Sequence, residues 1–167
     1  MRILIFGKNG QVGSSLLKLL SPAHQVLALD QADLDLVKTD EIESKISDFH
    51  PDWVINASAY TAVDRAEQQP EIADAINHLA PAAMAHACQA SGCGLLHYST
   101  DYVFDGDTDQ AYLETDTPNP QSVYGVTKLA GEQAVMQAYP QSIILRTAWV
   151  YAREGANFVN TMLRLAD

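Results

Sequence analysis

The sequence predicts a doubly wound α/β fold, in which helices cover both faces of a parallel β-sheet. Short apolar runs without polar alternation indicate strands that are buried on both faces. Segments with apolar residues at helical spacing alternate with these runs along the chain, as in successive βαβ units. We find no internal repeat and no linker, so residues 1–167 are expected to form one domain.

The first part of the chain predicts three strands and two helices. We expect strands at residues 2–6, 24–30 and 51–59, where the sequence is short, apolar and rich in β-branched residues. Leu16, Leu17 and Leu20 follow the first run at helical spacing. A second helix is expected over residues 39–50, because Pro51 stops it before the next strand.

The second part begins with a long alanine-rich helix, residues 70–91, which ends at Gly92. Pro81 lacks an N–H, so it should kink or split this helix near residues 77–80. Beyond it we expect further elements in the order strand, loop, helix, strand and helix. They are a strand at 94–99, an Asp-, Thr- and Pro-rich loop at 105–122, a helix beginning near Tyr124, a strand at 142–150 and a helix at 156–167.

The composition argues against several classes of partner. A net charge of −11 disfavours sequence-independent binding to a nucleic acid polymer or to an anionic membrane surface. The longest apolar runs are far shorter than the roughly 20 residues that span a bilayer, and Met1 leads directly into a strand, so we expect a cytoplasmic protein. Cys88 and Cys93 lack the spacing of a zinc site and are interpreted as buried thiols.

The segment "GKNGQVG" places Gly7, Gly10 and Gly13 between the first strand and the first helix. Such glycines allow a tight turn, close approach of a pyrophosphate, and close helix packing, which is typical of a Rossmann-type NAD(P)-binding domain. Asp30 ends the second predicted strand, where an acidic side chain meets the adenosine ribose hydroxyls. An Asp at this place favours NADH, whereas Lys8 nearby could accommodate the 2′-phosphate of NADPH, so both cofactors remain open.

Tyr124 and Lys128 are four residues apart at the start of a predicted helix and therefore share one helical face. A lysine in this position can stabilise a tyrosine phenolate, which helps the tyrosine to exchange a proton near neutral pH. Ser99 and Thr100 lie where a neighbouring strand should end. On spacing alone, an exposed surface pair and a catalytic pair remain equally open.

Taken together, "GKNGQVG", "NASAYT", "HYSTDYVFDG", "VYGVTKLAGE", "RTAWVY" and "NFVNTMLRLA" resemble the extended short-chain dehydrogenase/reductases, and within them the dTDP-4-dehydrorhamnose reductases. The resemblance covers essentially the whole chain. It implies hydride transfer from NADPH or NADH to the C4 keto group of a dTDP-sugar, the last step of dTDP-L-rhamnose synthesis.

The resemblance also assigns roles to individual positions. It implies Thr100, Tyr124 and Lys128 as the catalytic residues, and Thr100, Asp101 and Trp149 as the residues that touch the sugar. The cofactor-binding residues that it implies are Gly7, Gly10, Gln11, Val12, Gly13, Asp30, Asp35, Leu36, Ala59, Tyr60, Thr61, Tyr124 and Lys128. For Trp149, an aromatic residue that serves only packing is an open alternative.

Members of this family are longer and add a small C-terminal substrate domain, which is missing from these 167 residues. The resemblance therefore implies that this chain is the cofactor-binding portion, weakly active or inactive alone. No metal ligands are assigned within the chain, although the resemblance implies a homodimer with Mg²⁺-linked contacts in some members. Two alternatives remain: another nucleotide-sugar reductase or epimerase of the same superfamily, and a regulatory subunit that binds NADP without catalysis.

Overall fold

The computed structural model describes residues 1–153, 155 and 157–166, and it confirms the predicted α/β class. Its centre is a five-stranded, wholly parallel sheet with the order β2-β1-β3-β4-β5. The strands are β1 (Arg2–Phe6), β2 (Gln25–Leu29), β3 (Trp53–Asn56), β4 (Gly94–Thr100) and β5 (Ile143–Thr147). The helices are α1 (Gln11–Leu20), α2 (Thr39–Phe49), α3 (Val63–Ala66), α4 (Pro70–Asp74), α5 (Ala80–Ser91), α6 (Val123–Ala138) and α7 (Phe158–Ala166).

The direction of winding reverses at β1, which lies between β2 and β3. The chain first moves outward from β1 to β2 and then returns across β1 to begin β3. Register places Phe6 beside Leu29 on one side and beside Asn56 on the other, so these three strands end at the same edge. In open α/β sheets, ligands bind at the carboxyl ends of the strands where the winding reverses.

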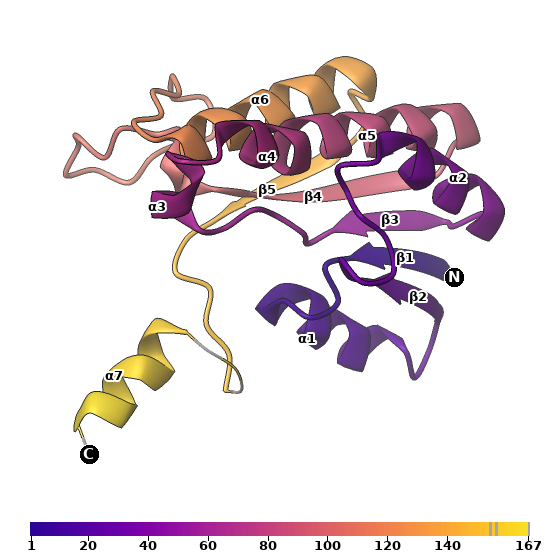
Figure 1. The fold of residues 1–167 in the computed structure, drawn as a ribbon, viewed down its shortest axis with the longest axis horizontal. Helices are drawn as coiled ribbons and strands as arrows, with labels where there is room; N and C mark the ends of the chain where they lie inside the picture. Colours follow the sequence, from indigo (N-terminus) through magenta and orange to yellow (C-terminus); the bar gives the residue numbers. More distant parts are fainter. Residues whose placement is uncertain (154, 156, 167) are drawn as a thin grey trace.

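Helices cover both faces of the sheet, but unequally (Figure 1). The helices α2, α5 and α6 lie over one face, where they enclose the larger core with residues such as Leu4, Val54 and Met84. The other face carries α1, whose Leu16 and Leu20 pack against a small cluster that includes Ile5. Apolar burial on both faces explains why the central strands read as continuous apolar runs.

The predicted interruption of the alanine-rich helix is confirmed. Between α4 and α5, residues Ala75–Leu79 form a single stretch of π-helix. Pro81 has no N–H to donate to the carbonyl of Asn77 four residues earlier, which removes one α-helical hydrogen bond at this point. Within this stretch, the buried side chain of Asn77 bonds to the loop after β3 and to α6.

Two predicted boundaries were too long. The strand expected over residues 142–150 ends at Thr147, and Trp149 has a positive φ of 51°, which an extended strand does not allow. The strand expected over residues 51–59 ends at Asn56, because the following residues turn into a loop at the sheet edge. The final helix is described as Phe158–Ala166, and residues 156 and 167 of the predicted range lie outside the described part of the chain.

Candidate active site

The predicted glycine turn joins β1 to α1 at the edge where the winding reverses. Gly7 has a φ of +91°, and its N–H donates to the carbonyl of Leu29 at 2.8 Å, which ties the turn to the end of β2. A side chain at Gly13 would overlap the carbonyl of Gly7, so α1 can approach the strand this closely only with glycine there. Gly10 caps α1 without a side-chain acceptor, which leaves the first N–H groups of the helix for an anion.

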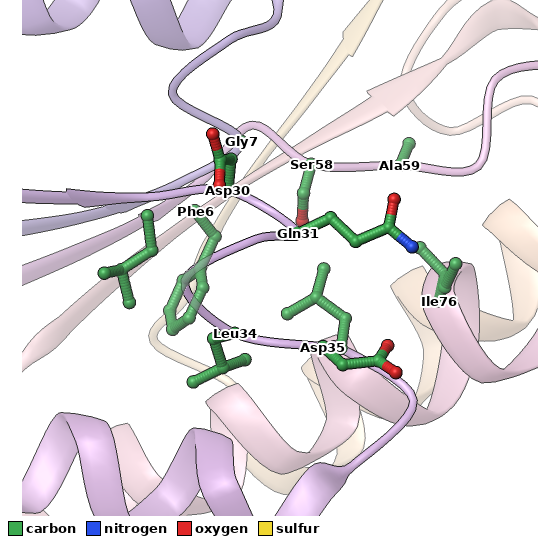
Figure 2. Close-up of a pocket in the computed structure, with 11 residues that line it drawn as sticks. Phe6, Gly7, Asp30, Gln31, Leu34, Asp35, Ser58, Ala59 and Ile76 are labelled. Atoms are coloured by element: carbon green, nitrogen blue, oxygen red, sulfur yellow. The ribbon is translucent and has the colours of Figure 1, made fainter.

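A first cavity, of about 140 Å³, lies beside this turn. Figure 2 shows its apolar side chains, such as Phe6 and Leu34, between two carboxylates, those of Asp30 and Asp35. The lining residues are Phe6, Gly7, Leu29, Asp30, Gln31, Leu34, Asp35, Leu36, Ser58, Ala59 and Ile76. An apolar slot with hydrogen-bond acceptors at its ends suits an adenosine group, as expected for Asp30, Asp35, Leu36 and Ala59.

The sequence did not identify Gln31 and Ile76 as part of this cavity. The side chain of Gln31 extends across the opening toward Ile76, which lies in the π-helical stretch (Figure 2). Ile76 lines the cavity from within this π-helical stretch, which no local sequence pattern indicates. Gln31 follows Asp30 directly, so its position next to a predicted ribose ligand was an available signal.

Asp30 is held by its neighbours rather than left free. Its Oδ1 accepts the N–H of Ala32 at 2.9 Å, and its Oδ2 accepts a short hydrogen bond from the amide of Asn9. Lys8 Nζ lies 3.7 Å from Asp30 and makes a closer ion pair of 2.5 Å with Asp33. This hydrogen bond raises the pKa of Lys8 and lowers that of Asp33. The cation that could meet a 2′-phosphate is therefore already paired with Asp33.

A second cavity, of about 720 Å³, shares Ser58 and Ala59 with the first. Its walls come from the glycine turn, the loop after β3, the end of β4 and the start of α6. The lining residues are Asn9, Gly10, Gln11, Val12, Ser14, Lys18, Ala57, Ser58, Ala59, Thr61, Tyr98, Ser99, Tyr124, Lys128, Thr147, Val150 and Gly155. Predicted cofactor residues from three separate segments, among them Gln11, Thr61 and Lys128, thus face one space.

Tyr124 lies in the first turn of α6, next to the end of β4. Ser122 caps the helix by accepting the N–H of Gly125 at 3.1 Å, which fixes where the helix begins. Burial raises the pKa of the Tyr124 hydroxyl, and a hydrogen bond with Thr100 opposes that rise. The structure thus places Tyr124 against Thr100, as the resemblance implied. A buried phenol with a raised pKa holds its proton until a base is presented to it.

Lys128 lies one helical turn further along and is almost fully buried, with 1% of its surface exposed. Its Nζ donates to the carbonyl of Tyr98 at 2.7 Å and lies 3.3 Å from Nε2 of His97. Burial lowers the pKa of Lys128 to about 8, although the charge of Glu132 opposes this. The predicted reading of an exposed surface pair is excluded, since both side chains are mostly or fully buried.

The loop after β3 is held in place by Asn77. Its side chain accepts the N–H of Tyr60 at 2.8 Å and donates to the carbonyl of Tyr60 at 3.2 Å. The same amide donates to the hydroxyl of Thr127 on α6 at 3.1 Å. The phenol of Tyr60 bonds to Gln69, its backbone N–H and carbonyl are both bonded to Asn77, and the residue lines neither cavity. The signal that could have revealed Asn77 is an asparagine four residues before a helical proline.

Asp101 and Trp149, which were predicted to touch a sugar, lie in different surroundings. Asp101 follows Thr100 directly and accepts a hydrogen bond of 3.2 Å from its hydroxyl. Trp149 is 74% exposed, packs edge-on against Phe158 on α7, and lines neither cavity. Within this chain, Trp149 therefore contacts a neighbouring aromatic residue, in agreement with the alternative of a packing role.

The described residues fit a bound dinucleotide. The uncapped start of α1 suits a pyrophosphate, and the buried Oε1 of Gln11 has no hydrogen-bond partner within the described protein atoms. Among residues 1–153, 155 and 157–166, no three His, Cys, Asp or Glu side chains are grouped as a metal site would require. No helix in the same described ranges is long and apolar enough to cross a membrane.

The profile of the family described as "RmlD substrate binding domain" matches residues 1–167. The dTDP-4-dehydrorhamnose reductase of Escherichia coli strain K12 is 45% identical over 170 residues, which cover 99% of this chain and 57% of that protein. The reductase of the same name from Sinorhizobium fredii is 46% identical and is covered to 56%. The chain thus spans a little over half the length of these curated relatives.

Solved structures agree with this likeness. The dTDP-4-dehydrorhamnose reductase of Bacillus anthracis in complex with NADP has a TM-score of 0.94 and 38% identity, covering 98% of this chain and 59% of that one. The UDP-glucose 4-epimerase of Thermus thermophilus in complex with NAD has a TM-score of 0.80 and 26% identity, covering 93% and 58%. By its fold, its site and its match over residues 1–167, the chain belongs to the RmlD substrate binding domain family.

Proposed function

We propose that the protein containing this chain reduces the C4 keto group of dTDP-4-dehydro-6-deoxy-L-mannose to give dTDP-L-rhamnose, with NADPH or NADH as the reductant. The observation that carries the proposal is that Tyr124 and Lys128 line a cavity that shares Ser58 and Ala59 with the apolar slot beside the glycine turn. The names of the relatives and the NADP complex of one of them support the same activity. Residues 1–167 would form its cofactor-binding domain.

In the proposed reaction, each residue of the site has its own role. A bound reduced nicotinamide supplies the hydride for the carbonyl carbon. Thr100 donates a hydrogen bond to the carbonyl oxygen, and Tyr124 transfers its phenolic proton to that oxygen as negative charge develops. Lys128, which lines the same cavity, would hold the ribose of the cofactor. Asp101 contacts the sugar, and Trp149 meets it only if α7 is placed differently in the complete protein.

Cofactor binding is the first test. Calorimetric titration of this chain with NADPH and with NADH should show one site for at least one of them, because both cavities lie within residues 1–155. Gly13→Leu would disrupt the glycine turn and should abolish that binding. Ile143→Thr, at an exposed position of β5, is the surface control and should bind the cofactor like the wild type. The proposal would be refuted if neither NADPH nor NADH bound to the chain.

Product analysis is the second test, in the complete gene product that contains this sequence. Incubation with NADPH and dTDP-4-dehydro-6-deoxy-L-mannose should consume one NADPH for each dTDP-L-rhamnose formed. An epimerase would interconvert sugar nucleotides without net oxidation of the cofactor, which the neighbouring epimerase structure makes the main competing outcome. Binding of NADP without turnover would instead indicate a regulatory subunit. Gel filtration of the same protein tests the expected homodimer.

A further inference from the structure

A chain of buried polar side chains leads from the end of β3 to Lys128. Asn56 on β3 and His97 on β4 are both fully buried, and Lys128 on α6 is nearly so. Asn56 Nδ2 lies 3.0 Å from His97 Nδ1, and His97 Nε2 lies 3.3 Å from Lys128 Nζ. Each hydrogen bond in such a series must have one donor and one acceptor. The direction of the first bond therefore determines which nitrogen of His97 carries a proton, and hence the direction of the second bond.

The orientation of the Asn56 amide is fixed by its other contacts. Its Oδ1 accepts the backbone N–H of Ser58 at 3.1 Å and the hydroxyl of Ser58 at 2.5 Å. A flipped amide would direct its NH₂ at that backbone N–H, so two donors would face each other. The Nδ2 group of Asn56 therefore faces His97, and because it can only donate, Nδ1 of His97 must be the acceptor.

It follows that His97 carries a single proton, and that this proton lies on Nε2. A doubly protonated ring would present an N–H to Asn56 Nδ2, which cannot accept it. Burial also lowers the pKa of His97 well below its usual value. The Nε2–H points at Nζ of Lys128. An ammonium group has three donors and no lone pair, whereas a neutral amine has one lone pair to receive this N–H.

We propose that Asn56 and His97 are positioning residues that fix the His97 tautomer and thereby hold Lys128 as a neutral amine in the cofactor-free protein. The remaining contacts agree with this. One amine N–H serves the carbonyl of Tyr98 at 2.7 Å, and the second is left for a ligand in the cavity. Burial lowers the pKa of Lys128 to about 8 against the opposing charge of Glu132, and acceptance of the His97 N–H lowers it further in the proposed state.

The other ionisable groups around Lys128 do not reverse this assignment. Glu132 on α6 raises the pKa of Lys128, but its carboxylate is bound by Arg146 of β5, with Nη2 to Oε2 at 2.6 Å. Tyr124, one turn before Lys128, has a raised pKa and is neutral. A neutral amine beside a neutral phenol places two fewer charged groups in the buried site than an ammonium and a phenolate would.

The test uses the cofactor-free chain and nitrogen NMR, and it needs no turnover. In the wild-type protein at pH 7, we expect the ¹⁵N shifts of His97 to show an unprotonated Nδ1 and a protonated Nε2. We expect Nζ of Lys128 to show the shift of a neutral amine at the same pH. A proton on Nδ1, or a charged Lys128 at pH 7, would overturn the proposal.

Two variants separate the tautomer from local packing. Asn56→Asp replaces the donor with a carboxylate, so the proton should move to Nδ1, Nε2 should become an acceptor, and the proton affinity of Lys128 should rise more than about 10-fold, one pKa unit. Ser58→Ala keeps the backbone N–H that orients Asn56 and should leave the tautomer unchanged. An unchanged tautomer in Asn56→Asp, or a rise in Lys128 affinity without a tautomer change, would overturn the proposal.

The inference about the charge of Lys128 does not depend on the proposed function. Only the role of Lys128 in catalysis rests on that function. The NMR readout is independent of the cofactor and of the sugar, so a protein that fails the reductase assay can still pass it. If Asn56→Asp does not fold, the wild-type spectra alone decide.

Discussion

At the scale of single residues, the surroundings of Tyr124 keep its phenol protonated. Burial raises the pKa of its hydroxyl, so the phenol stays protonated while the site is empty. Thr100 opposes that rise through a hydrogen bond, and its own hydroxyl also contacts Asp101 at 3.2 Å. In the proposed reaction, Tyr124 and Thr100 would both donate to the developing oxyanion.

Replacement of Tyr124 by Phe removes the proposed proton donor but keeps the ring that packs edge-on against Tyr102. We expect turnover of the complete protein to fall by about 10²-fold or more, a typical scale for a lost general acid, with cofactor affinity nearly unchanged. Steady-state kinetics and calorimetry measure the two quantities. Wild-type turnover in Tyr124→Phe would remove Tyr124 from the mechanism, and Tyr102→Phe is the matched control.

Cofactor choice depends on the ion pair between Lys8 and Asp33. Asp33→Asn should release Lys8 toward a 2′-phosphate and raise the ratio of NADPH to NADH affinity by up to about 5-fold, the scale of a surface charge pair. Lys8→Met should lower the same ratio. Calorimetric titration of both variants measures it, and a ratio that stays constant in both would show that Lys8 does not meet the adenosine end of the cofactor.

At the scale of elements, the position of α6 against the end of β4 determines whether Tyr124 and Thr100 can meet. After Thr100 the chain makes a short 3₁₀ turn, Asp101–Val103, and the Thr100 hydroxyl caps it by accepting the N–H of Tyr102 at 3.2 Å. Gly125 packs directly on the carbonyl of Tyr102. The helix therefore approaches the turn more closely than any side chain at residue 125 would permit.

Gly125→Ala should consequently displace α6 from the strand end. A Cβ would overlap the Tyr102 carbonyl, so we expect a loss of about 1–3 kcal/mol in the free energy of unfolding, the range for overpacking. Turnover should fall further than stability explains, because Tyr124 is the adjacent residue. Urea denaturation and kinetics measure the two effects. Val126→Ala, at an exposed position of the same helix, should change neither, and unaltered stability in Gly125→Ala would contradict the close contact.

At the scale of the whole molecule, the main body and α7 differ sharply in burial. The sheet and its covering helices enclose residues such as Leu4, Ile42 and Met84, whereas none of the described side chains of α7 is buried. Figure 1 shows α7 apart from the layered body, at the end of the loop after β5. The apolar side chains of Phe158, Leu163 and Leu165 are more than half exposed there.

A chain ending at Tyr151 should therefore keep its stability. We expect its free energy of unfolding to stay within about 1 kcal/mol of that of residues 1–167, because loss of exposed side chains removes little buried area. Ile42→Ala in the core should by contrast cost about 2–5 kcal/mol. Urea denaturation of both proteins makes the comparison, and a large loss on truncation would show that α7 contributes to the core.

Sequence by itself determined the α/β class, the parallel sheet, the glycine turn, the place of the helical interruption at Pro81 and most strand positions. These features follow from apolar periodicity and from the backbone limits of glycine and proline, which act between near neighbours in the chain. The pairing of Tyr124 with Lys128 was visible only as a spacing with two readings.

Tertiary structure excluded the exposed surface pair, since burial depends on segments far apart in sequence. It brought Thr100 to Tyr124, Asn77 to the loop after β3, and Asn56 and His97 to Lys128. It also placed Trp149 against Phe158, with most of its side chain exposed. Hydrogen bonds across 30 to 50 residues of chain have no local pattern, because each depends on how the strands and helices pack.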